Sequence, residues 1–214
     1  MKKIVACLLM GALSQSVWAL DAADQQRLSG IQQSWAHIQY EVPEDQRTAA
    51  FEKLAAQASS FTQQRQSVAE AWIWSGIVTS SWAGAQGGLG ALSKVKDAKA
   101  DLEKALTLDP KALQGSAYTS LGALYDRVPG WPIGFGDSDK AEQFLKLALQ
   151  MNPNGIDSLY FWGDHLYRQK RYSEARTTLQ KALQASPRPG RETADAGRRK
   201  EIEALLVDVN KKLD

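Results

Sequence analysis

The clearest pattern along the chain is a helical spacing of apolar and small residues in its C-terminal half. Apolar positions recur every three or four residues on both sides of a short polar turn, which predicts two amphipathic helices. Gly163 in the first helix and Ala175 in the second have little side chain, so the two helices can pack closely. Pro187 ends the pair. The positions that carry the pattern are Leu159, Trp162, Gly163, Leu166, Ala175, Leu179, Ala182 and Pro187.

The same spacing occurs twice more, upstream, and both copies predict a lengthened turn between their helices. In the nearer copy the turn is about seven residues longer, within residues 127–137. In the farther copy it is about ten residues longer, near residues 84–90. The nearer copy consists of Tyr118, Leu121, Gly122, Tyr125, Ala141, Leu145, Ala148 and Pro153. The farther copy consists of Trp72, Gly76, Ala98, Leu102, Ala105 and Pro110.

The flanks of these repeats also have helical patterns. Residues 24–40 and 43–64 predict two helices, with Pro43 at the first helical position of the second. Residues 195–212 predict an amphipathic helix that covers the last repeat. The chain is therefore predicted to be all-α, a solenoid of helical hairpins. We divide it into an export signal (1–19), an N-terminal helical cap or degenerate repeat (20–68), three repeats (69–190) and a C-terminal capping helix (191–214).

The repeat pattern resembles that of the tetratricopeptide repeat (TPR) family, whose repeats are helix-turn-helix units of about 34 residues. Residues 121–125, 128–132, 134–137 and 140–141 also resemble exported bacterial TPR proteins. These include the oligomeric TPR subunits associated with tripartite (TRAP-type) substrate importers. The resemblance implies binding of another protein and carries over no catalytic residue.

The first 19 residues have the pattern of a secretory signal. Lys2 and Lys3 precede an apolar run that ends near Leu13, and Ala19 suits the end of a cleavage site. We therefore expect export to the periplasm. A lipid anchor on Cys7 is the competing interpretation, but only six residues precede this cysteine, too few for a complete signal.

Composition disfavours nucleic-acid binding and metal chemistry. Without Lys2 and Lys3, the 26 basic residues fall to 24 and balance the 24 acidic ones. A nucleic-acid-binding protein normally has a basic excess. Two histidines and no cysteine after Cys7 offer little for a zinc site or a thiol nucleophile, so we expect no metal and no cofactor. Asp164 and His165 are adjacent on a helix and diverge too far to form a catalytic dyad. An enzyme is not expected; a hydrolase on a helical array is the remaining catalytic alternative.

The resemblance implies that side chains of the first helix of each repeat line a concave groove. A peptide or a segment of another subunit would bind there, and a solvated face without ligand is the alternative. The pairs Tyr160/Asp164 and Thr119/Ala123 lack the lysine and asparagine of the family's chaperone-tail clamp. The groove candidates for partner binding are Asp126, Arg127, Tyr160, Asp164, Tyr167 and Arg168.

The insertion around Trp131 is the second candidate for partner binding. Its prolines and glycines predict a defined non-helical loop, and such loops often bind ligands. Trp131 and Phe135 could fill a pocket of a partner. The sequence favours the other interpretation, in which both rings pack beneath the loop and Asp137 or Ser138 caps the next helix.

Aromatic and basic residues elsewhere are assigned mainly structural roles. Trp74 and Trp82 cannot both share the helix face of Trp72, so one of them could line a groove. The basic residues of segment 188–200 alternate with acidic ones, which favours a salt-bridged surface over an anion or headgroup site.

Together these observations predict an exported scaffold or adaptor. The first alternative is an importer-associated oligomer that encloses or relays a small ligand.

Overall fold

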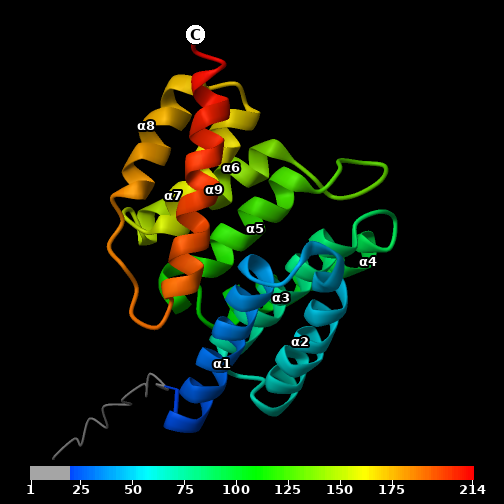
Figure 1. Cartoon of the computed structure of the whole chain (residues 1–214). Coiled ribbons are helices and arrows are strands. Elements are labelled where there is room, and N and C mark those ends of the chain that lie inside the picture. The colour runs from blue at the N-terminus through cyan, green and yellow to red at the C-terminus, as the bar shows by residue number, and fades with distance from the viewer. Residues whose placement is uncertain (1–19) are drawn as a thin grey trace, which may run out of the picture.

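The computed structural model describes residues 20–214, so the predicted export signal and Cys7 lie outside the described residues. Within residues 20–214 the chain is helical, contains no strand and forms a stack of antiparallel helix pairs (Figure 1). The prediction of an all-α solenoid is confirmed. The elements are α1 (Ala22–Tyr40), α2 (Glu44–Gln64), α3 (Ala69–Gln86), α4 (Ala91–Leu108), the 3-10 turn η1 (Ala112–Gly115), α5 (Ser116–Arg127), α6 (Ser138–Met151), α7 (Ile156–Arg168), α8 (Tyr172–Leu183) and α9 (Glu192–Asn210).

The small residues of the repeats lie at helix crossings, as predicted. A Cβ atom on Gly122 of α5 would lie 2.6 Å from Leu145 Cγ of α6. A Cβ atom on Gly163 of α7 would lie 2.7 Å from Leu179 Cγ of α8. The leucines at these crossings are fully buried, so they have no free space into which to move. Small residues therefore allow both helix pairs to pack closely.

The prediction of a lengthened turn in the first repeat is wrong. Gly76 does pack on Leu102, as the repeat requires, but α3 continues to Gln86 and α4 begins at Ala91. The additional residues therefore extend both helices, and only residues 87–90 link them. Residues 81–86 contain no proline, and the helix ends only where Gly87 and Gly88 adopt positive φ angles.

The N-terminal segment forms a further helix pair in front of the three repeats. Pro43 immediately precedes α2 at its N-cap instead of occupying the first helical position as predicted. Phe51, Leu54 and Ala58, which recur at helical spacing, form the buried face of α2.

Helix α9 and helix α1 close the stack into a ring. The first helices of successive pairs, α1, α3, α5, α7 and then α9, contact one another in this order, and α9 also packs against α1. Where α9 meets α1, a Cβ atom on Gly197 would collide with the ring of Tyr40. The glycine therefore allows α9 to lie close to the end of α1. In Figure 1, α9 begins at the end nearer α1 and runs from there beside α7 and α8 to the C-terminus. The face that the resemblance describes as an open groove is therefore the interior of this ring.

Candidate functional site

The ring interior is occupied by side chains of α7, of α9 and of the segment that joins α8 to α9. Asp157 at the start of α7 accepts hydrogen bonds from Arg198 Nε at 2.8 Å and from Arg188 Nη1 at 2.7 Å. The guanidinium of Arg198 also lies over the Tyr160 ring, 4.3 Å from its centroid. Burial would raise the pKa of Asp157, but the charges of Arg198 and Arg188 lower it well below its usual value. Tyr160 is thus covered by the chain's own arginine.

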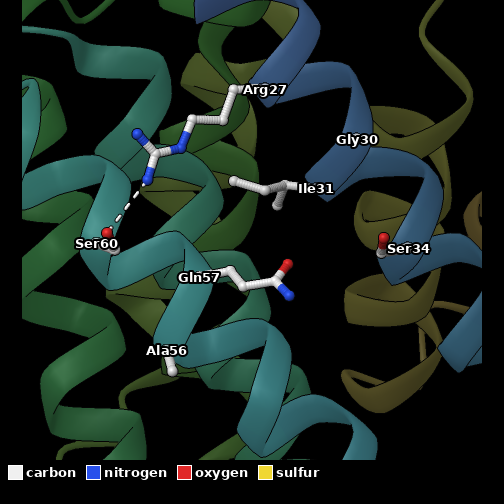
Figure 2. Close-up of a pocket in the computed structure, with 7 residues that line it drawn as sticks. All are labelled: Arg27, Gly30, Ile31, Ser34, Ala56, Gln57 and Ser60. Carbon is white, nitrogen blue, oxygen red and sulfur yellow. Dashed lines mark hydrogen bonds between the residues drawn. The ribbon is translucent and has the colours of Figure 1, made fainter.

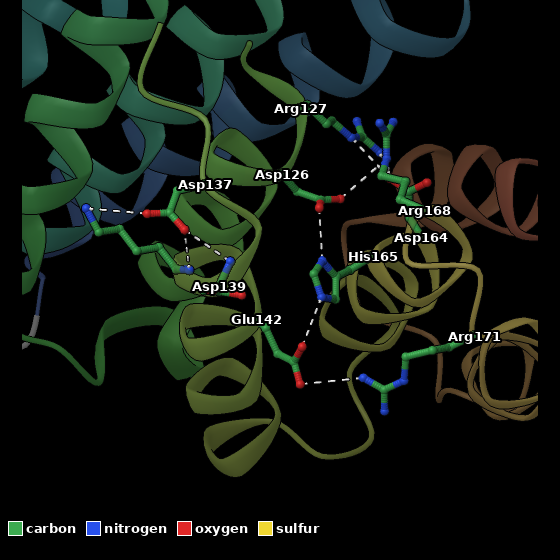
Figure 3. Close-up of polar contacts among 10 residues, drawn as sticks. Asp126, Arg127, Asp137, Asp139, Glu142, Asp164, His165, Arg168 and Arg171 are labelled. Atoms are coloured by element: carbon green, nitrogen blue, oxygen red, sulfur yellow. Dashed lines mark hydrogen bonds and ion pairs between the residues drawn. The ribbon is translucent and has the colours of Figure 1, made fainter. Parts of the chain in front are cut away.

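Four of the six predicted groove residues meet at the C-terminal ends of α5 and α7 (Figure 3). Arg127 Nη2 donates to Asp164 Oδ2 at 2.7 Å, and Arg168 Nε lies 3.3 Å from the same oxygen. Arg168 Nε also lies 3.4 Å from Asp126 Oδ2. Both carboxylates are buried, whereas both arginines are about half exposed. The cluster therefore compensates its own charges and links two repeats.

Tyr160 and Tyr167, the other two groove candidates, take no part in these ion pairs. Tyr160 is buried beneath Arg198, and the ring of Tyr167 packs on Tyr172 at 5.7 Å between centroids. The structure does not combine the six predicted residues into one open site.

One buried contact, between His165 and Asp126, was not predicted from the sequence. His165 is fully buried, its Nδ1 lies 2.9 Å from Asp126 Oδ1, and its Nε2 lies 3.6 Å from Glu142 Oε2 (Figure 3). Its ring stacks on Trp162, with the centroids 5.4 Å apart. Asp126 and His165 are 39 residues apart, so no local motif could have revealed the contact. These contacts connect α5, α6 and α7. Because His165 is fully buried, its imidazole is not accessible to a ligand from solvent.

Residues 128–137 form the connection between α5 and α6, which we call the Trp131 loop. The amide of Asp137 donates to the carbonyl of Tyr125 at 2.9 Å, and the amide of Gly136 donates to that of Pro129 at 2.9 Å. A Cβ atom on Gly136 would collide with the Val128 carbonyl, which explains the glycine. The Asp137 carboxylate caps α6 as predicted, accepting from the amides of residues 139 and 140. These contacts fix the base of the loop.

The tip of the Trp131 loop is exposed. Phe135 packs on Tyr125 with its ring edge-on, 5.3 Å between centroids, so the predicted inward packing is correct for this residue. For Trp131 it is wrong, because this side chain is 90% exposed, and Ile133 beside it is 60% exposed. Leu89, in the link between α3 and α4, is 84% exposed. Both links project from the same side of the molecule in Figure 1. A large apolar ring held in solvent by a fixed loop base is typical of a binding surface.

The other predicted aromatic and basic features are largely internal. Trp74 is buried against Trp35, with which it forms an edge-to-face pair at 5.9 Å. Trp82 is partly buried beneath Lys94. The basic residues of segment 188–200 form ion pairs, as expected. They do not all lie on the surface, which differs from the prediction. Arg198 is buried in the ring, and Arg199 donates to the carbonyls of residues 183 and 185.

Two grooves occur on the described part of the chain. One, of about 550 Å³, lies between α1 and α2 and is lined by Ile31 and by small and uncharged polar residues, with Arg27 as its single charged group (Figure 2). Arg27 is already occupied there, donating to Ser60 Oγ at 3.2 Å. The second groove, of about 630 Å³, follows the seam between α1 and α9 beside Tyr40 and Lys200. The second groove is lined by charged side chains of both signs, among them Glu41, Lys200 and Glu201.

Among residues 20–214 no cluster of three or more histidine and acidic side chains could hold a metal ion. No helix of the described region is both long and apolar enough to span a membrane.

Comparison with known proteins agrees with the helix-pair architecture. A model of the tetratricopeptide repeat family matches residues 133–191, which include the second half of the Trp131 loop, without Trp131 itself, and the helices α6, α7 and α8. Proteins of this family are generally non-catalytic scaffolds that bind protein partners. No sequence among the curated proteins matches the chain significantly. The family match over residues 133–191 and the stacked helix pairs together support a tetratricopeptide repeat protein.

Proposed function

We propose that the chain is an exported, periplasmic scaffold that binds another envelope protein through the Trp131 loop. The observation that carries this proposal is the exposure of Trp131 at the tip of a loop whose base is fixed by backbone hydrogen bonds. The family assignment supports a role in protein-protein interaction. The signal pattern of residues 1–19 supports export.

The Trp131 loop is a better candidate than the concave face because the concave face is filled. Arg198 covers Tyr160, and Arg127 and Arg168 are paired with Asp164. A peptide entering the ring would have to displace these contacts and leave buried carboxylates without partners, which is costly. Binding at the loop tip displaces only water from an apolar surface.

Trp131 is expected to account for much of the affinity. Tryptophan is enriched among residues that dominate binding energies, because it buries a large rigid surface at a small cost in side-chain entropy. Removal of such an anchor typically costs at least about 2 kcal/mol, which weakens binding about 30-fold. Ile133 would extend the same contact.

The proposal is tested by comparing Trp131→Ala with Leu89→Ala. Both substitutions remove an exposed apolar side chain from a link between helices, so neither should lower the thermal midpoint appreciably. Partners captured by the wild-type mature protein from periplasmic extract are identified, and their dissociation constants are measured with both variants. The proposal predicts about 30-fold weaker binding for Trp131→Ala only. Equal affinities of wild type and Trp131→Ala would refute it.

The importer-associated subunit remains the alternative to be tested within the same family. It would be a homo-oligomer, so light scattering after size-exclusion chromatography separates the two cases. A strict monomer favours the scaffold. A stable trimer that dissociates in Trp131→Ala would mean that the loop binds a second copy of the chain.

Export and processing are tested directly on cells. Mass spectrometry of the protein from the periplasmic fraction should find an N-terminus near Leu20. A protein confined to the cytoplasmic fraction, or a lipid on Cys7, would refute the proposed maturation.

A further inference from the structure

Two hydrogen-bond donors inside the ring have no acceptor. Both Trp74 Nε1 and Arg191 Nε are buried, and neither has a hydrogen-bond partner among the described residues. Neighbouring Trp35 differs, because its Nε1 donates to Ser81 Oγ at 2.8 Å. A buried N–H without an acceptor costs about 1–3 kcal/mol, and more if the group is charged, so two such donors in one place require an explanation.

The two donors belong to one cluster. The guanidinium of Arg191 lies over the ring of Trp74, 5.0 Å from its centroid. The ring of Trp35 meets Trp74 edge-on at 5.9 Å and meets Tyr40 edge-on at 5.8 Å. The cluster thus combines one cation, Arg191, with the aromatic rings of Trp74, Trp35 and Tyr40. It is assembled from α1, α3 and the residue that precedes α9.

The carboxylates near Arg191 are held by other arginines. Asp195 accepts from Arg188 Nε at 2.7 Å, and Asp157 accepts from both Arg188 and Arg198. No carboxylate among the described residues lies within ion-pair distance of Arg191. Burial lowers the pKa of Arg191, and the positive charge of Arg188 lowers it further. A buried guanidinium is normally paired with an anion.

We propose that Arg191 and Trp74 form a binding site for a small carboxylate anion in the ring interior. A carboxylate has two acceptor oxygens, so one can accept from the guanidinium edge and the other from the indole N–H. The aromatic side chains limit the size of the anion and exclude water, which strengthens the charge interaction. The site is separate from the Trp131 loop, so its failure would leave the proposed function untouched.

The test uses the mature protein with sodium acetate as the probe and sodium chloride at equal ionic strength as the reference. Binding is followed by the thermal midpoint, by calorimetric titration and by the indole N–H signal of Trp74 in an NMR spectrum. Acetate should raise the midpoint above that in chloride and shift the Trp74 signal, because a ligand that binds only the folded state stabilises it.

Two variants identify the donors. Trp74→Phe removes the indole N–H and keeps an aromatic ring, and it also assigns the Trp74 signal. Arg191→Met removes the cation. Each should weaken acetate binding about ten- to a hundredfold, since hydrogen bonds to charged groups contribute about 1.5–3 kcal/mol. Arg176→Met, on the exposed surface of α8, is the matched control and should bind acetate like the wild type.

The variants also separate a binding role from a structural one. In chloride alone, Arg191→Met should be at least as stable as the wild type, because it removes a buried charge without a partner. A strongly destabilised Arg191→Met, or acetate binding that survives both substitutions, would overturn the proposal. So would a wild-type protein that acetate neither stabilises nor shifts, which would mean that water satisfies the two donors.

Discussion

The close packing of Gly122 against α6 can be tested by the substitution Gly122→Ala, which adds one methyl group, and by its effect on the free energy of unfolding. In Gly122→Ala the new Cβ would lie 2.6 Å from Leu145 Cγ and 3.3 Å from the carbonyl oxygen of Ala141. Leu145 is fully buried, so α5 and α6 must move apart to make room. In Gly30→Ala, within α1, the new Cβ would meet no atom within 4 Å. The two substitutions are chemically identical and both lie inside helices.

The comparison cancels the effect of helix propensity. Alanine favours the helix over glycine by about 1 kcal/mol at both sites. Overpacking of a buried site costs about 1–3 kcal/mol and applies to Gly122 only. We therefore expect Gly30→Ala to be more stable than the wild type by up to about 1 kcal/mol. Gly122→Ala should be about 2 kcal/mol less stable than Gly30→Ala, a gap of roughly 4–8 °C in thermal midpoint for a chain of this size.

The assay is urea unfolding followed by circular dichroism, with the thermal midpoint as a second measure. The urea dependence of the unfolding free energy should stay the same in both variants, which shows that the folded states remain comparable. If Gly122→Ala proved as stable as Gly30→Ala, the close crossing of α5 and α6 would be incorrect.

Two further predictions concern the ring interior and the loop base. Asp157→Asn should lower the free energy of unfolding at pH 7 by about 2 kcal/mol. The folded state lowers the pKa of Asp157, so the ionised carboxylate stabilises the protein fully above the pKa of the unfolded chain, about 3.9. Below about pH 4 this stabilisation is lost, and the difference in unfolding free energy between the variant and the wild type should shrink in a series of urea-unfolding measurements. A gap that grows as the pH falls would contradict this ion pair. Phe135→Ala should destabilise by roughly 1–3 kcal/mol, since it leaves a space beside Tyr125, whereas Trp131→Ala should stay within about 0.5 kcal/mol of the wild type. Equal thermal midpoints of these two variants would contradict the opposite orientations of their rings.

The repeat architecture could be predicted from the sequence because it depends on local spacing. Gly163 and Ala175 lie where the pattern places them, and Asp137 caps α6 as expected. The extension of α3 to Gln86 was not predicted, because a fixed repeat length assigns surplus residues to the turn. The helix ends instead at Gly87 and Gly88, which adopt positive φ angles.

The ring closure could not be predicted, because it depends on contacts between the two ends of the described chain. Gly197 contacts Tyr40, and the pattern of a single repeat contains no information on such a contact. This closure buries Tyr160 and turns a predicted groove into an interior. The orientation of Trp131 was equally inaccessible, since the same loop sequence allows the ring to point inward or outward.

The central functional claim is that partners contact the Trp131 loop and not the concave face. Its most direct test is photo-crosslinking in cells, with a photoreactive amino acid placed at Ile133 on the loop in one strain and at Tyr160 in the ring interior in another. The account predicts a discrete adduct with a second protein from position 133 and none from position 160. An adduct from position 160, with none from position 133, would show that the ring opens to bind its partner and would contradict the account.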